Sequence, residues 1–159
     1  MTRTWPDDWE ERLRGAACPA CAEGRPDEAE GRLRIYAGKV VDAYLNRDDA
    51  ARGYTVVYWR GRHVADPTEL DDEAASAFWR ELLHVSRALE RYYSPAKLNL
   101  LLLGNSVPHL HAHVVPRYVD DVDPGRPPRF MMTDGRDWQP LDDALYLREV
   151  HALRELLSN

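Results

Sequence analysis

Within residues 108–117 three histidines alternate with three apolar side chains, and this alternation constrains the fold more strongly than any other part of the chain. Imidazoles stand at His109, His111 and His113, and leucine, alanine and valine fill the positions between and after them. Successive side chains of a β-strand point to opposite faces, so a strand here would set the three imidazoles on one face, about 6–7 Å apart. The sequence therefore predicts a half-buried strand over 109–115 that carries a row of histidines.

The surrounding sequence predicts several further strands and one long helix. Apolar residues from Asp71 to Tyr92 recur at steps of three and four, which is typical of a helix with one apolar stripe that stops before Pro95. Period-two patterns, β-branched residues and turn residues mark the other elements. The predicted strands are 33–37, 40–45, 54–59, 98–103 and 109–115, the predicted helices are 5–15, 71–92 and 141–157, and the predicted loops are 22–31 and 120–137.

These elements predict an α+β domain on a mainly antiparallel sheet, with one long helix and a C-terminal helix. The 159 residues have room for one core and are short for two, so we expect a single domain over 1–159. A hydrophobic fraction of 44% and a charged fraction of 30% are ordinary for a globular protein.

Composition also argues against some partners. The longest apolar stretch, 98–104, is far shorter than the roughly 20 residues that a membrane span needs. The N-terminal residues contain no apolar signal region, so we expect a cytoplasmic protein without a membrane partner. The formal net charge of −6 disfavours binding to a nucleic acid polymer, whereas a few local arginines still suit a small anionic ligand.

The clustered histidines allow three interpretations. In one, the ring nitrogens bind a metal ion; in another, a neutral imidazole is a nucleophile and its neighbours orient it or the leaving group. The third is a solvated strand face that happens to be rich in histidine. Half of the chain's six histidines fall within five residues at strict alternation, which disfavours the third interpretation.

The segment from His109 to Val115 resembles the signature of the histidine-triad superfamily, which is His-x-His-x-His followed by two apolar residues. The following Pro-Arg pair matches a common continuation, and residues 53–63 resemble the upstream strand of that family. Asn46 and its neighbours resemble the fragile-histidine-triad branch, the dinucleoside polyphosphate hydrolases, at the asparagine that contacts ribose. The resemblance covers Cys18 to Arg117, and it implies a HIT-like α+β fold and a homodimer.

The resemblance implies that His111, the middle histidine, attacks the α-phosphorus of a nucleotide and forms a covalent nucleotidyl-histidine. His113 would bind a phosphate oxygen or help to place His111, and no organic cofactor is expected. Hydrolysis completes the simplest reaction, and transfer to phosphate or another acceptor, as in a phosphorylase or nucleotidyltransferase, is the alternative. A nucleotide-binding interaction protein with little catalysis and a metallohydrolase with three histidine ligands also stay open.

Five residues are candidates for substrate binding. The resemblance implies that Asn46 contacts the ribose and that Asn105 and Ser106 lie near the α-phosphate, where their donors suit developing negative charge. Arg117 is a candidate for the distal phosphates, and Trp138 for the substrate or a partner subunit. Asparagine and serine are also common turn residues, and arginines in polar loops are commonly solvated.

The two cysteines, Cys18 and Cys21, are spaced C-x-x-C, which supplies half of a tetrahedral zinc site. A redox pair and two free thiols are the alternatives. The chain resembles histidine-triad members of the uridylyltransferase branch, in which zinc binds two cysteines, one upstream histidine and the first histidine of the motif. That resemblance implies a structural zinc at Cys18, Cys21, His63 and His109, although the strand before His63 carries one apparent extra residue.

Overall fold

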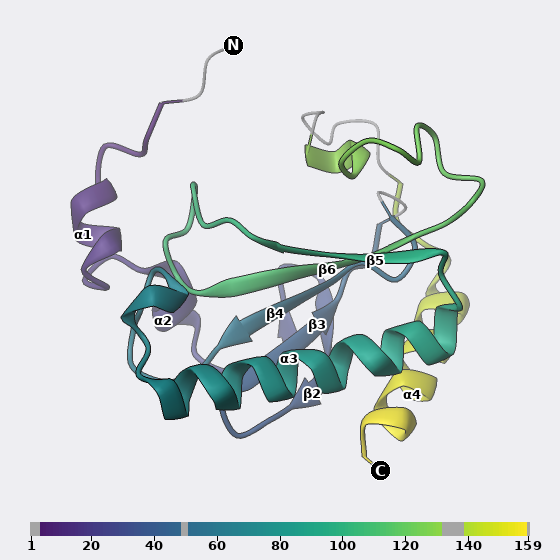
Figure 1. The fold of residues 1–159 in the computed structure, drawn as a ribbon, viewed down its shortest axis with the longest axis horizontal. Coiled ribbons are helices and arrows are strands. Elements are labelled where there is room, and N and C mark those ends of the chain that lie inside the picture. Colours follow the sequence, from purple (N-terminus) through teal and green to yellow (C-terminus); the bar gives the residue numbers. More distant parts are fainter. Residues whose placement is uncertain (1–3, 49–50, 132–138, 159) are drawn as a thin grey trace.

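The computed structural model describes residues 4–48, 51–131 and 139–158. Its strands form one antiparallel sheet in the order β1-β2-β3-β4-β6-β5, and the two longest helices pack against it (Figure 1). The strands are β1 (Glu28–Ala29), β2 (Arg32–Ala37), β3 (Val41–Leu45), β4 (Thr55–Trp59), β5 (Lys97–Leu102) and β6 (His111–Arg117). The helices are α1 (Trp9–Leu13), α2 (Pro19–Glu23), α3 (Asp72–Tyr93) and α4 (Asp143–Leu157), with short 3-10 turns η1 (Pro67–Glu69) and η2 (Arg129–Met131). The predicted α+β fold is confirmed.

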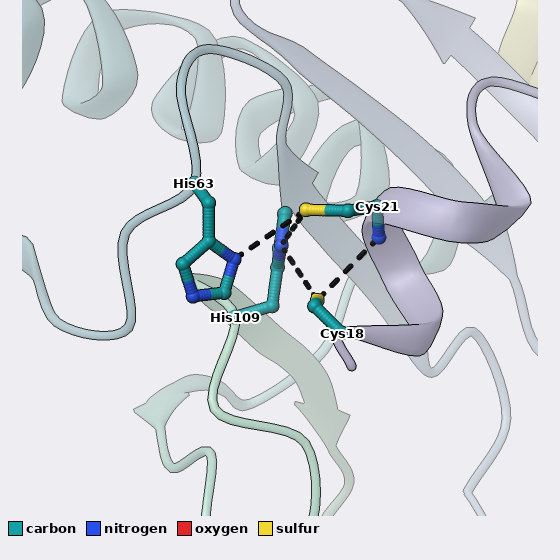
Figure 2. A group of neighbouring side chains, drawn as sticks. All are labelled: Cys18, Cys21, His63 and His109. Atoms are coloured by element: carbon teal, nitrogen blue, oxygen red, sulfur yellow. Dashed lines mark hydrogen bonds between the residues drawn. The ribbon is translucent and has the colours of Figure 1, made fainter. Parts of the chain in front are cut away.

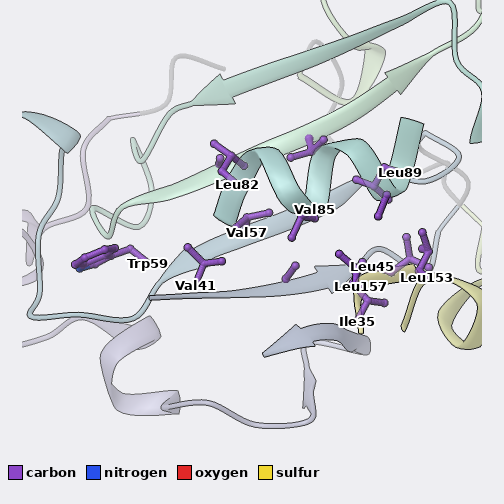
Figure 3. Close-up of a cluster of buried hydrophobic side chains, with 14 of the residues drawn as sticks. Ile35, Val41, Leu45, Val57, Trp59, Leu82, Val85, Leu89, Leu153 and Leu157 are labelled. Carbon is purple, nitrogen blue, oxygen red and sulfur yellow. The ribbon is translucent and has the colours of Figure 1, made fainter. Parts of the chain in front are cut away.

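Helix α3 covers one face of the sheet and supplies the largest part of the core. Its apolar stripe is buried, and Figure 3 shows Leu82, Val85 and Leu89 in one cluster with Val41 and Leu45 of β3 and Val57 of β4. The helix begins where the Asp71 carboxylate accepts a hydrogen bond from the Ala74 amide at 2.8 Å. It ends at a residue in the left-handed conformation, one position before the proline that the sequence predicted as its limit.

Helix α4 closes the open end of the core beside β2. The carboxylate of Asp142 caps it by accepting from the Leu145 amide at 3.0 Å. The Tyr146 hydroxyl, which is buried, donates to the Leu45 carbonyl at 2.8 Å and accepts from the Leu33 amide at 2.7 Å. One buried phenol therefore ties α4 to two neighbouring strands.

The opposite face of the sheet carries the histidines. Strand alternation puts His111 and His113 of β6 on that face, while the alternating residues Ala112 and Val114 enter the core beneath α3. A second, smaller apolar cluster forms here where η2 packs its Phe130 against β4 and β6. In Figure 1 the loop after β6 lies on the side of the sheet away from α3.

Four sequence expectations need correction. The N-terminal helix covers only Trp9–Leu13 instead of 5–15: it begins later than predicted, and it ends before Gly15, which adopts a positive φ of 85°. A second helix, α2, follows Cys18, and the predicted loop over 22–31 contains β1. The histidine strand begins at His111, because the His109 amide turns back to bond the Val107 carbonyl at 2.8 Å.

In the described residues no helix is long and apolar enough to cross a membrane.

Candidate metal-binding and catalytic site

Four metal-ligating side chains meet where the N-terminal segment approaches the start of β6. Cys18 and Cys21 come from α2 and its N-cap, His63 from the loop after β4, and His109 from the turn before β6. Their ligand atoms all lie within 4.8 Å of one another. Figure 2 shows both imidazoles facing the two sulfurs: Sγ of each cysteine lies 3.5 Å from Nδ1 of His109, and Sγ of Cys21 lies 3.4 Å from Nδ1 of His63.

Local backbone structure explains how the cysteines converge. Cys18 is the N-cap of α2, with Pro19 at the first helical position, and its sulfur accepts a hydrogen bond from the Cys21 amide at 3.4 Å. A glycine lets this segment close on His63: a Cβ on Gly15 would lie 2.8 Å from Cγ of that imidazole. Close approach and a positive φ both therefore require glycine at position 15.

Backbone carbonyls fix the protonation of both imidazoles in the cluster. Nε2 of His109 lies 2.8 Å from the Trp59 carbonyl, and Nε2 of His63 lies 3.1 Å from the Leu13 carbonyl. A carbonyl only accepts, so each Nε2 carries the proton and each Nδ1 offers its lone pair to the cluster. Burial lowers the pKa of His109, which keeps it neutral, and burial together with Cys18 raises the pKa of the Cys21 thiol to about 11.

A buried ion-pair network holds α2 against the sheet. The Asp42 carboxylate is fully buried and accepts from Arg25 at 2.7 and 2.8 Å and from Arg60 at 3.0 Å. Nη1 of Arg34 lies 3.7 Å from the same carboxylate. Arg60 also donates to the Ala20 carbonyl inside α2 at 3.4 Å. The cysteine helix is thus connected to β3 and β4 through charged groups as well as through the cluster.

The second and third histidines form a hydrogen-bonded row on β6. Nδ1 of His111 lies 2.6 Å from the His109 carbonyl, and Nε2 of His111 lies 3.1 Å from Nε2 of His113. Nδ1 of His113 lies 2.7 Å from the hydroxyl of Tyr54, the residue that precedes β4 in the chain. The Tyr58 ring stacks on His111, with centroids 5.5 Å apart and an interplanar angle of 29°.

This row has one consistent arrangement of protons. The His109 carbonyl can only accept, so Nδ1 of His111 donates and its Nε2 keeps a free lone pair. Nε2 of His113 then carries the proton that lies between the two rings. Burial lowers the pKa of both imidazoles, to about 4 for His113, and the positive charge of Arg32 on β2 lowers both further. The result is a neutral imidazole with an available nitrogen beside a hydrogen-bond donor.

His109 lies before β6 rather than within the strand, although its ring stays 6.4 Å from the Tyr58 ring that stacks on His111. Its ring turns into the cysteine cluster, because the backbone at His109 forms a turn with Val107 just before β6 begins. His111 and His113 do share a face, as predicted. His63 lies in the cluster despite the apparent extra residue in the preceding strand.

The predicted substrate-binding residues differ from one another in burial and in their hydrogen-bond partners. Asn46 is buried directly after β3, where its amide donates to Asp48 at 2.6 Å. Asn105 and Ser106 are exposed in the β5–β6 connection. The guanidinium of Arg117 is buried and donates to Asp121, Asn99 and the Arg126 carbonyl, which favours a bracing role for the following loop over a phosphate contact. Trp138 lies outside the described residues.

Sequence reasoning missed four residues of this region: Tyr54, Tyr58, Arg32 and Asp42. The alternation of β2, β3 and β4 gives a weak signal, because it puts a set of large polar side chains on the face opposite the core. Strand order decides which of these side chains approach the histidines, and that order cannot be read from alternation alone.

Comparison with known proteins identifies the family of this chain and proteins of similar fold. The HIT domain family matches residues 30–120, more than half of the chain. A histidine triad protein from Bradyrhizobium japonicum superposes with a TM-score of 0.66 at 26% identity, covering 79% of this chain and 90% of that one. A zinc-bound histidine triad family protein from Mycobacterium smegmatis gives a TM-score of 0.59 at 22% identity, with coverage of 89% and 94%.

A curated relative, protein hit from Bacillus subtilis strain 168, is 30% identical over 90 residues. The match covers 54% of this chain and 61% of the Bacillus protein, so it spans less than two thirds of that relative. The family match includes β2 to β6 and all three histidines of the motif. The chain therefore belongs to the HIT domain family.

Proposed function

We propose that this protein is a nucleotide hydrolase in which His111 attacks the α-phosphorus of a substrate such as a dinucleoside polyphosphate or a nucleoside phosphoramidate. Membership of the HIT family supports nucleotide processing in general. The observation that carries the specific proposal is the 2.6 Å contact between Nδ1 of His111 and the His109 carbonyl. It directs the lone pair of Nε2 away from the backbone, where it is available for nucleophilic attack.

The proposed reaction has two steps. In the first, a bond forms between Nε2 of His111 and phosphorus, and the leaving group departs with the electron pair of the broken bond. In the second, water attacks the same phosphorus, the electron pair of the N–P bond returns to His111, and the proton of the water passes to solvent. The lowered pKa of His111 supports this chemistry, because a protonated imidazole has no free electron pair.

Neighbouring groups supply binding and charge stabilisation. The N–H at Nε2 of His113 lies where it can turn from His111 to a phosphoryl oxygen once the N–P bond forms. Arg32 adds a positive charge near both histidines, which favours an anionic substrate. Asn46 stays our candidate for the ribose, and Asn105 and Ser106 for the phosphate.

Trapping of the intermediate tests the reaction. The full-length protein is mixed with a dinucleoside tetraphosphate, a nucleoside phosphoramidate and a nucleotide-sugar in turn, quenched within seconds, and analysed by mass spectrometry. We expect a nucleotidyl adduct that His111→Ala abolishes and that His151→Ala, an exposed histidine on α4, retains. An adduct or full turnover in His111→Ala contradicts the proposal. Turnover that needs added phosphate indicates a phosphorylase, and binding without turnover indicates an interaction protein.

A structural zinc is the second part of the proposed function. A tetrahedral ion with Zn–S bonds of about 2.3 Å and Zn–N bonds of about 2.0 Å holds sulfur and nitrogen ligands about 3.5 Å apart. The sulfur–nitrogen distances of 3.4 and 3.5 Å in the cluster fit that geometry. Four protein ligands would close the site to water, so zinc would contribute stability and hold His109, whose carbonyl orients His111.

Metal analysis of the purified full-length protein tests the zinc site. We expect about one equivalent of zinc in the wild type and in His84→Ala, and loss of it in Cys18→Ser and in His63→Ala. Removal of zinc by a chelator should lower the melting temperature of the wild type. A wild-type protein that stays metal-free after refolding with zinc would rule the site out.

We also propose a homodimer, the partner that the family resemblance implies. Strand β5 lies at the edge of the sheet, and its Leu100 is 39% exposed. Leu103 after the strand and Trp79 on α3 are similarly exposed. An apolar strand edge of this kind is suited to pairing with a second copy of the chain.

A further inference from the structure

The Tyr54 hydroxyl stands at the end of the hydrogen-bonded row of histidines. Its distance of 2.7 Å to Nδ1 of His113 is that of a strong hydrogen bond. Strand β4 pairs with β6 (Figure 1). Tyr54 immediately precedes β4, so its phenol reaches His113 across one strand pairing. Its ring is held in turn by Phe130, which stacks on it with centroids 4.6 Å apart and an angle of 15°.

The direction of this hydrogen bond follows from the opposite end of the row. Because the His109 carbonyl forces the proton of His111 onto Nδ1, Nε2 of His113 must donate toward His111. Nδ1 of a neutral His113 is then an acceptor, and Tyr54 must be the donor. Burial raises the pKa of Tyr54 well above its ordinary value, so the hydroxyl keeps the proton that this arrangement requires.

We propose that Tyr54 is a positioning residue that holds His113 in the tautomer with its proton on Nε2, the nitrogen that faces the reacting atoms. Without the hydroxyl, Nδ1 of His113 loses its donor, and the tautomer with the proton on Nδ1 becomes competitive. In that tautomer two nitrogen lone pairs, one from each histidine, face each other at 3.1 Å, and the donor for the phosphoryl oxygen is lost. This role rests on the proposed function of His111.

Tyr54→Phe removes the hydroxyl and keeps the ring that stacks on Phe130. Tyr44→Phe is the matched control: it also removes a buried phenol hydroxyl on the same face of the sheet, but that hydroxyl donates to the Pro26 carbonyl at 2.8 Å. Nitrogen-15 NMR of the ring nitrogens of full-length protein reads the His113 tautomer directly. Rapid-quench kinetics of the nucleotidyl adduct reads the chemical step.

We expect the Nε2-protonated tautomer of His113 in the wild type and in Tyr44→Phe, and a mixture of tautomers in Tyr54→Phe. Adduct formation in Tyr54→Phe should slow by about 10–100-fold, with little change in KM, as for loss of a group that orients another. An unchanged tautomer, or a changed tautomer with an unchanged rate, would overturn the proposal. A tautomer change in a protein that forms no adduct even as wild type would support the hydrogen-bond assignment and refute the proposed function instead.

Discussion

Asp42→Asn tests how the cysteine segment is attached to the sheet. The substitution keeps the shape of the side chain and removes its charge, leaving Arg60, whose side chain is only 6% exposed, without its buried counter-ion. Arg25 and Arg34 are 42% and 18% exposed, so water can solvate them in part. Breaking a buried pair from one side costs about 3–5 kcal/mol, and the partial exposure of two partners favours the lower end, about 3 kcal/mol.

The assay is chemical and thermal unfolding of the metal-saturated protein at pH 7. For a domain of this size a loss of about 3 kcal/mol should lower the melting temperature by about 6–12 °C. Asp27→Asn is the control, because Asp27 pairs with Arg34 at 2.5 Å while its side chain is 87% exposed, and such a pair contributes at most about 1 kcal/mol.

Zinc affinity gives a second measurement on the same variant. Arg60 donates to the Ala20 carbonyl between the two cysteines, so Asp42→Asn should also weaken zinc binding. The reasoning fails if Asp42→Asn unfolds within about 1 kcal/mol of the wild type, or if it costs no more than Asp27→Asn.

Three further predictions concern the histidine face and the sheet edge. The pKa of His113 is about 4 in the folded protein and about 6.5 in the unfolded chain, so the free energy of unfolding should fall by up to about 3 kcal/mol as the pH drops from 6.5 to 4. Denaturant unfolding of His113→Phe across the same pH range should lack this loss of stability. Arg32→Gln removes a nearby positive charge, so NMR titration should show a higher pKa for His113, whereas Arg34→Gln should leave it unchanged. Leu100→Arg on β5 should convert the proposed dimer to a monomer, as measured by light scattering. Leu147→Arg on α4, which changes another exposed leucine away from that strand edge, should leave the dimer intact.

Local sequence determined the elements that need only local physics. The three-and-four spacing from Asp71 onward, an aspartate at the N-cap and Pro95 beyond the end are enough to define α3. Period-two alternation is equally local, so the pairing of His111 with His113 on one face was predictable. The C-x-x-C spacing predicted that Cys18 and Cys21 share a site, and the structure brings them together.

The family resemblance extended these predictions across the chain. It placed His63 and His109 with the cysteines, although they are 46 residues apart and no periodicity links them. It also assigned the middle histidine a role that alternation alone does not assign. Where a prediction relied on the chemistry of a single side chain, as for Arg117 at the end of β6, the structure shows that side chain bonded to Asp121 and to the Arg126 carbonyl.

Only the tertiary structure decided which distant groups meet. Strand order brings Tyr54 to His113 and aims Arg32 at the same face, and the turn at His109 redirects one imidazole from the strand to the cysteines. The direction in which a strand side chain points depends on its own backbone, so sequence can predict it. The atom that the side chain then contacts depends on strand order and register, which arise from the packing of the whole core and are not contained in any local pattern.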